Sequence, residues 1–257
     1  MSDRTGGLER WRDAVALITG ASSGIGRAVA EALAGSGMRV AAAARRVDRL
    51  RELADAVAAE SGADRVLPVP VDLRDEASIG RMFAAVRERW GAVEVLVNNA
   101  GLGHDAPLCS GRTEHWREML EVNVLALCVC TREALADMAR TGRGHVIHVS
   151  SMAAHRVPPQ SGVYSATKFA VRALTEALRQ ELRAAGSPVR VRAVSPGYVE
   201  TEFVEKYHRS AELARETYGR YRVLEPRDVA ATVLHVLSAP PHVQIHDVLM
   251  RCTDQPG

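Results

Sequence analysis

The sequence predicts an α/β fold in which one doubly wound parallel sheet of about seven strands carries helices on both faces. Three observations predict this fold class. Short apolar runs alternate with helical patterns along the whole chain. The first run leads into a glycine-rich turn and then into a helical stretch. No linker, repeat or break in composition divides the 257 residues, so we expect residues 1–257 to form a single domain.

Six apolar runs are the expected strands of this sheet. Most of them are continuously apolar, which is typical of parallel strands that helices cover on both faces. The third run contains Pro68 and Pro70, neither of which can donate a hydrogen bond to a neighbouring strand, so we expect it at the edge of the sheet. The runs are residues 14–19, 39–44, 65–71, 93–98, 145–150 and 189–195.

Helical patterns fill the segments between these runs. Val47, Leu50, Leu53, Ala54 and Val57, for example, follow steps of three and four residues and form one apolar stripe. Right-handed crossovers through such helices predict the strand order 3-2-1-4-5-6, with the third run at the edge.

Composition and charge exclude several classes of protein. Apolar residues make up 47% and charged residues 25%, which indicates a globular chain. The net charge is only +2, and no basic run is interleaved with aromatics, so we expect no nucleic-acid partner. No apolar run reaches membrane-spanning length and the start MSDRTGGLERWRD is polar, so we expect a cytoplasmic protein without a membrane partner. The cysteines form no CxxC pair and the histidines show no ligand spacing, so we expect free thiols and no metal site.

The turn after the first expected strand, Thr19–Gly26, has the sequence TGASSGIG and indicates a nucleotide site. Glycines let the backbone approach a pyrophosphate closely, and the start of the following helix offers free N–H groups. A tight turn without a ligand is the alternative, but the strand before it and the helix after it favour a dinucleotide. The expected cofactor contacts in this turn are Gly20, Ser22, Ser23, Gly24, Ile25 and Gly26.

The end of the second expected strand decides between the two dinucleotides. An acidic residue here would hydrogen-bond the adenosine ribose 2′-hydroxyl of NAD, but Ala44 stands in its place. Arg45 and Arg46 follow, and their guanidinium groups suit a 2′-phosphate. A solvated helix start is the alternative, since 31 of the 33 basic residues are arginine. The missing acid is the stronger clue, and we expect NADP(H) to be preferred over NAD(H).

Tyr164 and Lys168 lie four residues apart in a helical stretch and therefore on one face of that helix. Lys168 is one of only two lysines in the chain, which indicates that arginine would not serve at this position. A nearby ammonium group favours the phenolate, so we expect a lowered pKa of Tyr164 and a role for it in proton transfer. Ser151 closes the fifth expected strand, where its hydroxyl can hydrogen-bond the same substrate oxygen. Each residue alone fits an ordinary surface or turn, but the three together do not.

Further polar residues lie near the same edge of the sheet. Asn98, Asn99, Ala100 and Gly101 close the fourth expected strand. Asn123 lies within an apolar helical run, where an amide is unusual, and this indicates a local polar role.

We expect residues 198–221, which follow the sixth expected strand, to form a lid over the substrate. Tyr198, Tyr207, Tyr218 and Tyr221, four of the five tyrosines, lie in this segment, which suits an aromatic wall around a partly apolar substrate. An amphipathic pair of surface helices is an equally good interpretation.

These motifs together resemble the short-chain dehydrogenase/reductase family over nearly the full chain. The resemblance rests on TGASSGIG, Asp72, NNAG at 98–101, Asn123, Ser151, YSATK at 164–168 and PG at 196–197. It implies a single Rossmann-type domain that forms a homodimer or homotetramer through the helices at 113–140 and 160–185. Within the family, ERWRD, HRVPP, LTEALRQELR and the terminal APPHVQIHDVLMR most resemble the group of dehydrogenase/reductase member 11 and insect farnesol dehydrogenase. The chain departs from that group at IHD, residues 245–247, where the group has glycine before the aspartate.

The resemblance also implies a role for each site residue. Tyr164 is the acid–base, and Lys168 binds the nicotinamide ribose and lowers the pKa of that tyrosine. Ser151 polarises the carbonyl, and Asn123 holds a relay water. The other implied cofactor contacts are Asp72 and Leu73 at the adenine, Asn99, Ala100 and Gly101 along the cofactor, and Pro196, Gly197, Val199 and Thr201 toward the nicotinamide.

The sequence thus predicts an NADP(H)-dependent oxidoreductase that interconverts a carbonyl and its alcohol by hydride transfer. The resemblance implies a ketone or aldehyde of steroid, dicarbonyl or isoprenoid type. A 3-hydroxy acid or serine dehydrogenase is one alternative, for which Arg209, Arg215 or Arg220 would face a substrate carboxylate. A cofactor-binding sensor without turnover is another, although the catalytic set is complete. An epimerase or dehydratase fits less well, because such chains are usually longer.

Overall fold

The computed structural model of the chain describes residues 7–62 and 64–255. Within them, seven parallel strands form one sheet in the order β3-β2-β1-β4-β5-β6-β7. Residues 1–6 of the polar start and the last two residues of the expected domain lie outside the described residues. The strands are β1 (Val15–Thr19), β2 (Arg39–Ala44), β3 (Val66–Pro70), β4 (Val95–Asn98), β5 (His145–Val149), β6 (Arg190–Pro196) and β7 (Asp247–Met250).

The predicted fold class is confirmed. Each of the six expected runs coincides with a strand whose ends lie within two residues of the predicted ones. β3, with Pro68 and Pro70, is an edge strand, as these prolines predict. The sequence did not locate β7, because this strand is only four residues long, begins with an aspartate and is not fully buried.

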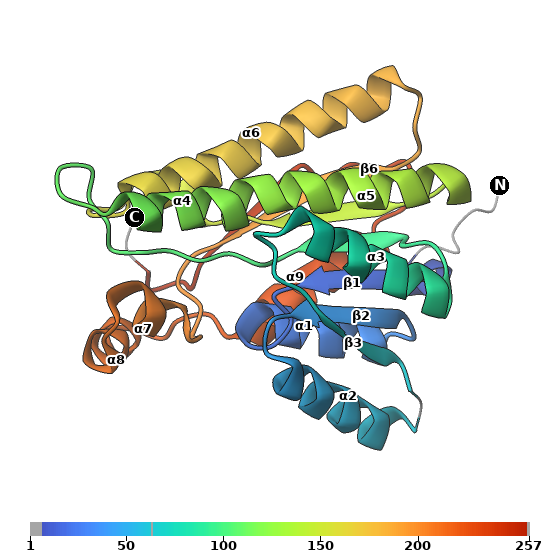
Figure 1. The fold of residues 1–257 in the computed structure, drawn as a ribbon, viewed down its shortest axis with the longest axis horizontal. Helices are drawn as coiled ribbons and strands as arrows, with labels where there is room; N and C mark the ends of the chain where they lie inside the picture. The colour runs from blue at the N-terminus through green and yellow to red at the C-terminus, as the bar shows by residue number, and fades with distance from the viewer. Residues whose placement is uncertain (1–6, 63, 256–257) are drawn as a thin grey trace.

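Helices cover both faces of the sheet, as Figure 1 shows. Val29 and Leu33 of α1, Leu50 of α2 and Val233 of α9 belong to the core on one face. The core on the other face is built from α3, α5 and α6 and includes the fully buried Phe83. The helices of the first face are α1 (Gly24–Gly35), α2 (Val47–Ser61) and α9 (Pro226–Ser238). Those of the second are α3 (Glu76–Trp90), α5 (Ala126–Thr141) and α6 (Gly162–Ala184), with α4 (Thr113–Leu120) leading toward α5.

The segment predicted as a lid contains two short helices, α7 (Phe203–His208) and α8 (Ala211–Gly219). Figure 1 shows them beyond the carboxyl ends of the strands, at the left of the view. None of the helices in the described parts of the chain combines the length and apolar character that crossing a membrane requires.

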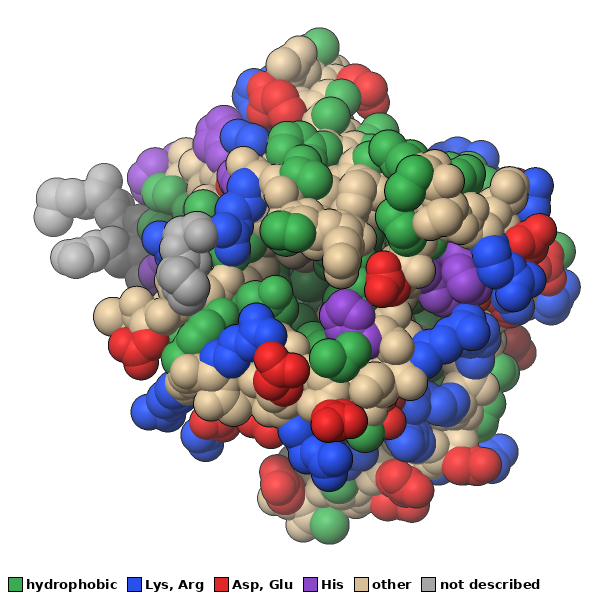
Figure 2. Space-filling view, turned by 90° about the vertical axis from the view of Figure 1, so that its left-hand side faces the viewer, with side chains coloured by type: hydrophobic (Ala, Val, Ile, Leu, Met, Phe, Trp, Pro, Cys, Tyr) green, Lys and Arg blue, Asp and Glu red, His purple; other side chains and the backbone are tan. Residues whose placement is uncertain are grey.

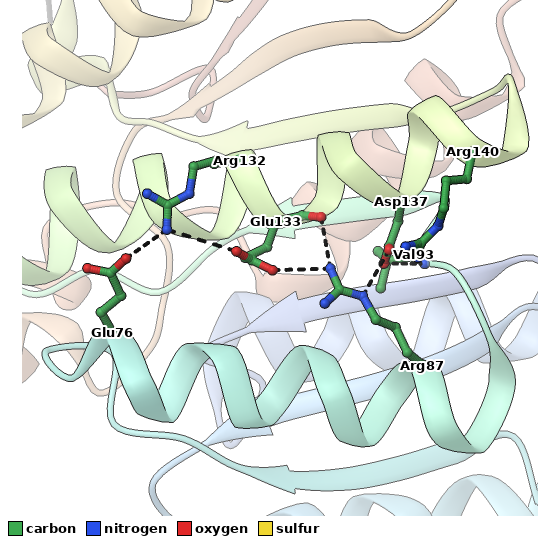
Figure 3. Close-up of polar contacts among 7 residues, drawn as sticks. All are labelled: Glu76, Arg87, Val93, Arg132, Glu133, Asp137 and Arg140. Carbon is green, nitrogen blue, oxygen red and sulfur yellow. Dashed lines mark hydrogen bonds and ion pairs between the residues drawn. The ribbon is translucent and has the colours of Figure 1, made fainter.

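A network of charged side chains joins α3 to α5 (Figure 3). The fully buried carboxylate of Asp137 accepts hydrogen bonds from Arg87 Nε at 2.9 Å and from the backbone N–H of Val93 at 3.1 Å. Arg87 also donates to the carboxylate of Glu133 at 3.1 Å. Because the buried charge is paired and its oxygens accept hydrogen bonds, this network holds two helices together.

Three arginines gather at the other end of the sheet, around the last turn of α9. Arg192 is fully buried, and its Nη1 donates to the carbonyl of Val236 at 3.0 Å. Arg190 Nη1 and Arg10 Nη2 both donate to the carbonyl of Ala239. The last carbonyl groups of a helix carry partial negative charge, so these guanidinium groups cap α9.

Candidate active site

A cleft of about 750 Å³ opens at the carboxyl ends of the strands. Its walls come from the residues that follow β1 to β6 and from α7 and α8. Figure 2 views this end of the molecule, which is hollowed near the middle, with hydrophobic side chains around the hollow. Ligands of open α/β sheets bind at this edge, where the loops after the strands meet.

The cleft brings together the predicted site residues, with two exceptions. Gly26 and Asn123 are buried and do not line it. A Cβ atom at Gly26 would lie 2.4 Å from Asn99 Nδ2 and 2.5 Å from Gly20 O, so this glycine allows the turn to close without touching a ligand. The predicted residues that line the cleft are Gly20, Ser22, Ser23, Gly24, Ile25, Arg45, Arg46, Asp72, Leu73, Asn99, Ala100, Gly101, Ser151, Tyr164, Lys168, Pro196, Gly197, Val199 and Thr201.

Ser151, Tyr164 and Lys168 meet on one wall of the cleft. Ser151 follows β5, and its Oγ accepts from the backbone N–H of Ala153 at 3.0 Å, which fixes the hydroxyl at a strand end. Tyr164 and Lys168 lie in the first two turns of α6. Lys168 Nζ donates to the carbonyl of Val149 at 3.0 Å and lies 5.8 Å from the centre of the Tyr164 ring. The predicted juxtaposition of phenol, ammonium and hydroxyl is therefore present.

The electrostatics of this trio differ from the expectation of a lowered tyrosine pKa. Burial raises the pKa of Tyr164 to about 12, against a smaller lowering by its hydrogen bond with Ser151. Burial also lowers the pKa of Lys168 to about 8. The prediction is wrong for the protein's own side chains, because desolvation of the phenolate outweighs the favourable contacts.

Asn123 lies in a short π-helical segment, Glu121–Leu125, between α4 and α5. Its Oδ1 accepts from Leu102 N at 2.9 Å, and its Nδ2 donates to Leu102 O at 2.8 Å and to Thr167 Oγ1 at 3.0 Å. Segments of π-helix are frequent at functional sites, where they redirect a side chain. The amide of Asn123 thus holds the loop after β4 against α6. Its implied part in holding a relay water stays a prediction.

The glycine-rich turn forms the opposite end of the cleft, between β1 and α1. Gly20 has a φ of 70°, in the left-handed region that glycine adopts without strain. Asn99 Nδ2 donates to the carbonyl of Thr19 at 2.8 Å and ties the turn to the loop after β4. Ser23 precedes α1, but its side chain does not cap this helix. The first N–H groups of α1 are therefore available to an anion.

Arg46 lies between this turn and the end of β2. Its Nη2 donates to Ser23 Oγ at 2.6 Å, and its Nε donates to Ser22 Oγ at 3.2 Å. Ala44 at the end of β2 and the following Arg45 also line the cleft. A glycine turn, a helix start and a guanidinium group along one open cleft fit a dinucleotide.

Aromatic side chains of α7 cover the ring of Tyr164. The ring centres of Phe203 and Tyr207 lie 5.3 Å and 6.2 Å from it. The predicted aromatic wall is therefore present in part. Of the four tyrosines expected there, Tyr198, Tyr207 and Tyr218 line the cleft, and Tyr221 does not.

Gln255 and Arg156 are among the cleft residues that sequence reasoning missed. Gln255 comes from the C-terminal segment, is 4% exposed, and its Oε1 accepts from Tyr198 N at 3.2 Å. Arg156 lies soon after Ser151, and its buried Nε has no hydrogen-bond partner among the described residues. Gln255 reaches the cleft only through the path of the folded chain, and no motif marks it. Arg156 belongs to the HRVPP segment, but this segment was used only for the family resemblance and did not indicate a site.

The three arginines expected to face a substrate carboxylate do not line the cleft. Arg209 Nη2 is bonded to His115 Nε2 at 3.2 Å, and Arg220 is paired with Glu216 at 2.8 Å. Arg215 lies in α8 and is exposed. This expectation is wrong because the short lid helices turn these side chains away from the cleft.

Comparison with known proteins agrees with the geometry. Residues 14–212 match the family described as short chain dehydrogenase. The chain is 49% identical over 253 residues to dehydrogenase/reductase SDR family member 11 of Bos taurus, which covers 96% of this chain and 99% of that protein. It is 40% identical over 248 residues to farnesol dehydrogenase of Aedes aegypti, which covers 95% and 98%. The solved structure of the closed form of serine dehydrogenase complexed with NADP+ is similar at a TM-score of 0.88 and 33% identity, over 95% of this chain and 96% of that one.

The identities confirm the family and the group that the sequence motifs predicted. They extend over nearly all of this chain and of each relative, so the likeness concerns the whole fold and its cleft. The chain belongs to the short-chain dehydrogenase family and is an NAD(P)-dependent oxidoreductase.

Proposed function

We propose that this enzyme acts on CH–OH groups with NADP as the acceptor and interconverts a ketone or aldehyde and its alcohol. The observation that carries the proposal is the meeting of Ser151, Tyr164 and Lys168 on one wall of a cleft that ends at the glycine-rich turn. When bound, the nicotinamide supplies or accepts the hydride.

The side chains of the site handle the proton. During reduction Tyr164 gives its hydroxyl proton to the carbonyl oxygen of the substrate, and during oxidation it takes the proton back. The raised pKa of Tyr164 keeps it protonated at neutral pH, which suits an acid. Ser151 donates a hydrogen bond to the same oxygen as charge develops there. The ammonium group of Lys168, with a pKa of about 8, stabilises the phenolate that forms.

The preference for NADP(H) over NAD(H) is supported at the end of β2. Ala44 stands where an acidic residue would bind the ribose of NAD, and Arg45 and Arg46 line the cleft beside it. The similar serine dehydrogenase structure is a complex with NADP+, which supports the same choice.

A partly apolar carbonyl compound, of steroid, dicarbonyl or isoprenoid type, is the substrate class that we propose. Met152, Phe203 and Tyr207 line the cleft, so its catalytic end offers apolar and aromatic contact. Residues 198–221 would act as a lid, since α7 and α8 form one wall. The name of the related farnesol dehydrogenase is in line with an isoprenoid substrate.

A 3-hydroxy acid or serine dehydrogenase is the second candidate, and Arg156 is the observation that favours it. Arg156 lines the cleft, and its Nε has no hydrogen-bond partner among the residues that the structure describes, so this side chain has a donor left for a carboxylate. A related structure is that of a serine dehydrogenase.

A panel of substrates tests these proposals. Consumption of NADPH and NADH is followed with aldehydes, diketones, ketosteroids and 3-oxo acids, and serine is tested with NADP. We expect turnover of an apolar carbonyl and a higher kcat/KM with NADPH than with NADH. Turnover confined to acids, and lost in Arg156→Leu, would support the second candidate. Tight NADPH binding without any turnover would support a silent sensor.

We also propose that the protein forms a homo-oligomer. Leu120, Leu125 and Phe169 are exposed on or beside α4 and α6, which supports a homodimer or homotetramer through these helices. Light scattering during gel filtration measures the mass, and a monomer would contradict the proposed oligomer.

All four cysteines are free thiols, which supports a cytoplasmic location.

A further inference from the structure

The carboxylate of Glu202 lies among three cations at the end of the cleft where α2 begins. Glu202 directly precedes α7, and its Oε2 accepts from Arg46 Nη1 at 2.9 Å. Arg49 and Lys206 also donate to this carboxylate. Burial raises the pKa of Glu202, but the hydrogen bonds from the three cations outweigh burial and hold the pKa well below its ordinary value. Glu202 is therefore an anion bound by the start of α2.

Arg46 is the side chain that this carboxylate shares with the proposed cofactor site. Three of its nitrogen atoms are already used, because it donates to Ser22 Oγ, to Ser23 Oγ and to Glu202. Carboxylates and phosphates accept hydrogen bonds from the same N–H edges of a guanidinium group. A 2′-phosphate beside Ala44 and Glu202 would thus accept hydrogen bonds from the same N–H groups of Arg46. The phosphate and the carboxylate of Glu202 would also repel each other, because both are anions.

We propose that Glu202 is a specificity-determining residue that competes with the 2′-phosphate of NADP(H) for Arg46 and thereby reduces the preference for NADP(H) over NAD(H). This inference rests on the proposed NADP(H) dependence. A cofactor without the phosphate leaves the contacts of Glu202 intact, whereas a cofactor with it must displace them. The cost of displacement is subtracted from the binding free energy of the phosphorylated cofactor alone.

The contact also connects the two ends of the cleft. Glu202 is followed by Phe203 and Tyr207, whose rings lie 5.3 Å and 6.2 Å from that of Tyr164. Binding of a 2′-phosphate therefore acts on the helix that forms the wall above the catalytic tyrosine.

Calorimetric binding of 2′,5′-ADP and of 5′-ADP tests the proposal without any turnover. Glu202→Gln removes the charge at the contact, and Glu205→Gln removes the same charge from an exposed position on α7. We expect Glu202→Gln to bind 2′,5′-ADP roughly tenfold more tightly than the unmodified enzyme, with 5′-ADP affinity within about twofold. Glu205→Gln should change neither affinity.

The outcomes separate this inference from the proposal on which it rests. Arg46→Gln should weaken 2′,5′-ADP binding in either case. If the unmodified enzyme does not prefer 2′,5′-ADP and Arg46→Gln changes nothing, the NADP(H) dependence and the inference both fail. If that preference exists and depends on Arg46, but Glu202→Gln binds like the unmodified enzyme or more weakly, only the inference is overturned. Equal gains in Glu202→Gln and Glu205→Gln would overturn it as well, since net charge would then be the cause.

Discussion

Two buried cations lie near opposite ends of strands β5 and β6, and they serve different purposes. Lys168 lies beside the carboxyl ends of the strands, and Arg192 lies near their amino ends. Both cations are buried, and each donates to a backbone carbonyl at 3.0 Å. Burial lowers the pKa of both. By burial, hydrogen bonding and pKa, the two residues look alike.

Lys168 and Arg192 differ in their surroundings. Lys168 lies over the ring of Tyr164 in an open cleft, whereas Arg192 faces the last turn of α9 in the closed core. A perturbed pKa therefore does not by itself identify a catalytic group, because structural capping of a helix produces the same shift. Access to a cleft and a reactive neighbour make the distinction.

Lys168→Met should have the largest effect among the tests of this comparison. Loss of the ammonium group removes the charge that stabilises the phenolate, so we expect kcat to fall by roughly 10²- to 10³-fold. The free energy of unfolding should stay the same or increase, because a buried charge is removed. Steady-state kinetics and urea denaturation of the same preparation measure both. Near-normal turnover would place Lys168 in the same class as Arg192.

Asn123→Ala tests a second buried polar residue near the carboxyl ends of the strands. The change removes three hydrogen bonds that hold the loop after β4 to α6, so we expect kcat to fall about tenfold or more and stability to fall by about 2–3 kcal/mol.

Asn98→Ala is the matched control for this prediction. Asn98 is also buried and donates to Thr131 Oγ1 of α5 at 2.9 Å, but this hydrogen bond does not join the loop after β4 to α6. This variant loses one hydrogen bond, so its stability should fall by about 1–2 kcal/mol with little change in kcat. Equal losses of kcat in both variants would show that the effect of Asn123 is general destabilisation.

The pH dependence of carbonyl reduction tests the charge of Lys168. We expect kcat/KM to fall above pH of about 8, where Lys168 loses its proton, while Tyr164 with a pKa of about 12 keeps its own. The unfolded chain holds the lysine proton up to its ordinary pKa of 10.5. The contribution of this lysine to stability therefore rises with pH between about 8 and 10 while activity falls. A flat rate profile to pH 10 would contradict the assignment.

Arg192→Met should have the smallest effect. The lost hydrogen bond to Val236 costs about 1 kcal/mol, and removal of a buried charge offsets it, so stability should stay within about 2 kcal/mol of the original or exceed it. The kcat should not change. A much larger loss of stability would indicate that the guanidinium group has an anionic partner.

The sequence predicted most of the fold because apolar runs and a glycine turn follow directly from burial and backbone sterics. It did not locate β7, in which Asp247 and a short length hide the pattern. Ser151, Tyr164 and Lys168 were predicted as a catalytic set because proton transfer requires particular residue types at particular spacings, and the structure brings them together. Gln255 was not found, since only the folded path of the chain brings it to the cleft. Glu202 follows the predicted contact Thr201, but no pattern in the sequence indicates that it pairs with Arg46.

The pKa of Tyr164 was predicted in the wrong direction for a related reason. Spacing along a helix places Lys168 near Tyr164, but it does not reveal that α7 folds over the ring and reduces its contact with water. Burial by a distant segment is a property of the tertiary structure. The same applies to Arg209, whose contact with His115 depends on how α7 ends.

Turnover by Tyr164→Phe tests the central claim most directly, because this change removes one hydroxyl group and keeps the ring that packs against Phe203. NADPH binding, the rate of carbonyl reduction and thermal unfolding are measured for both proteins in parallel. The account predicts that kcat falls by roughly 10³-fold or more, with NADPH affinity and unfolding nearly unchanged. A variant that keeps most of its turnover would show that the proton comes from another group, and would contradict the assignment of Tyr164 as the acid.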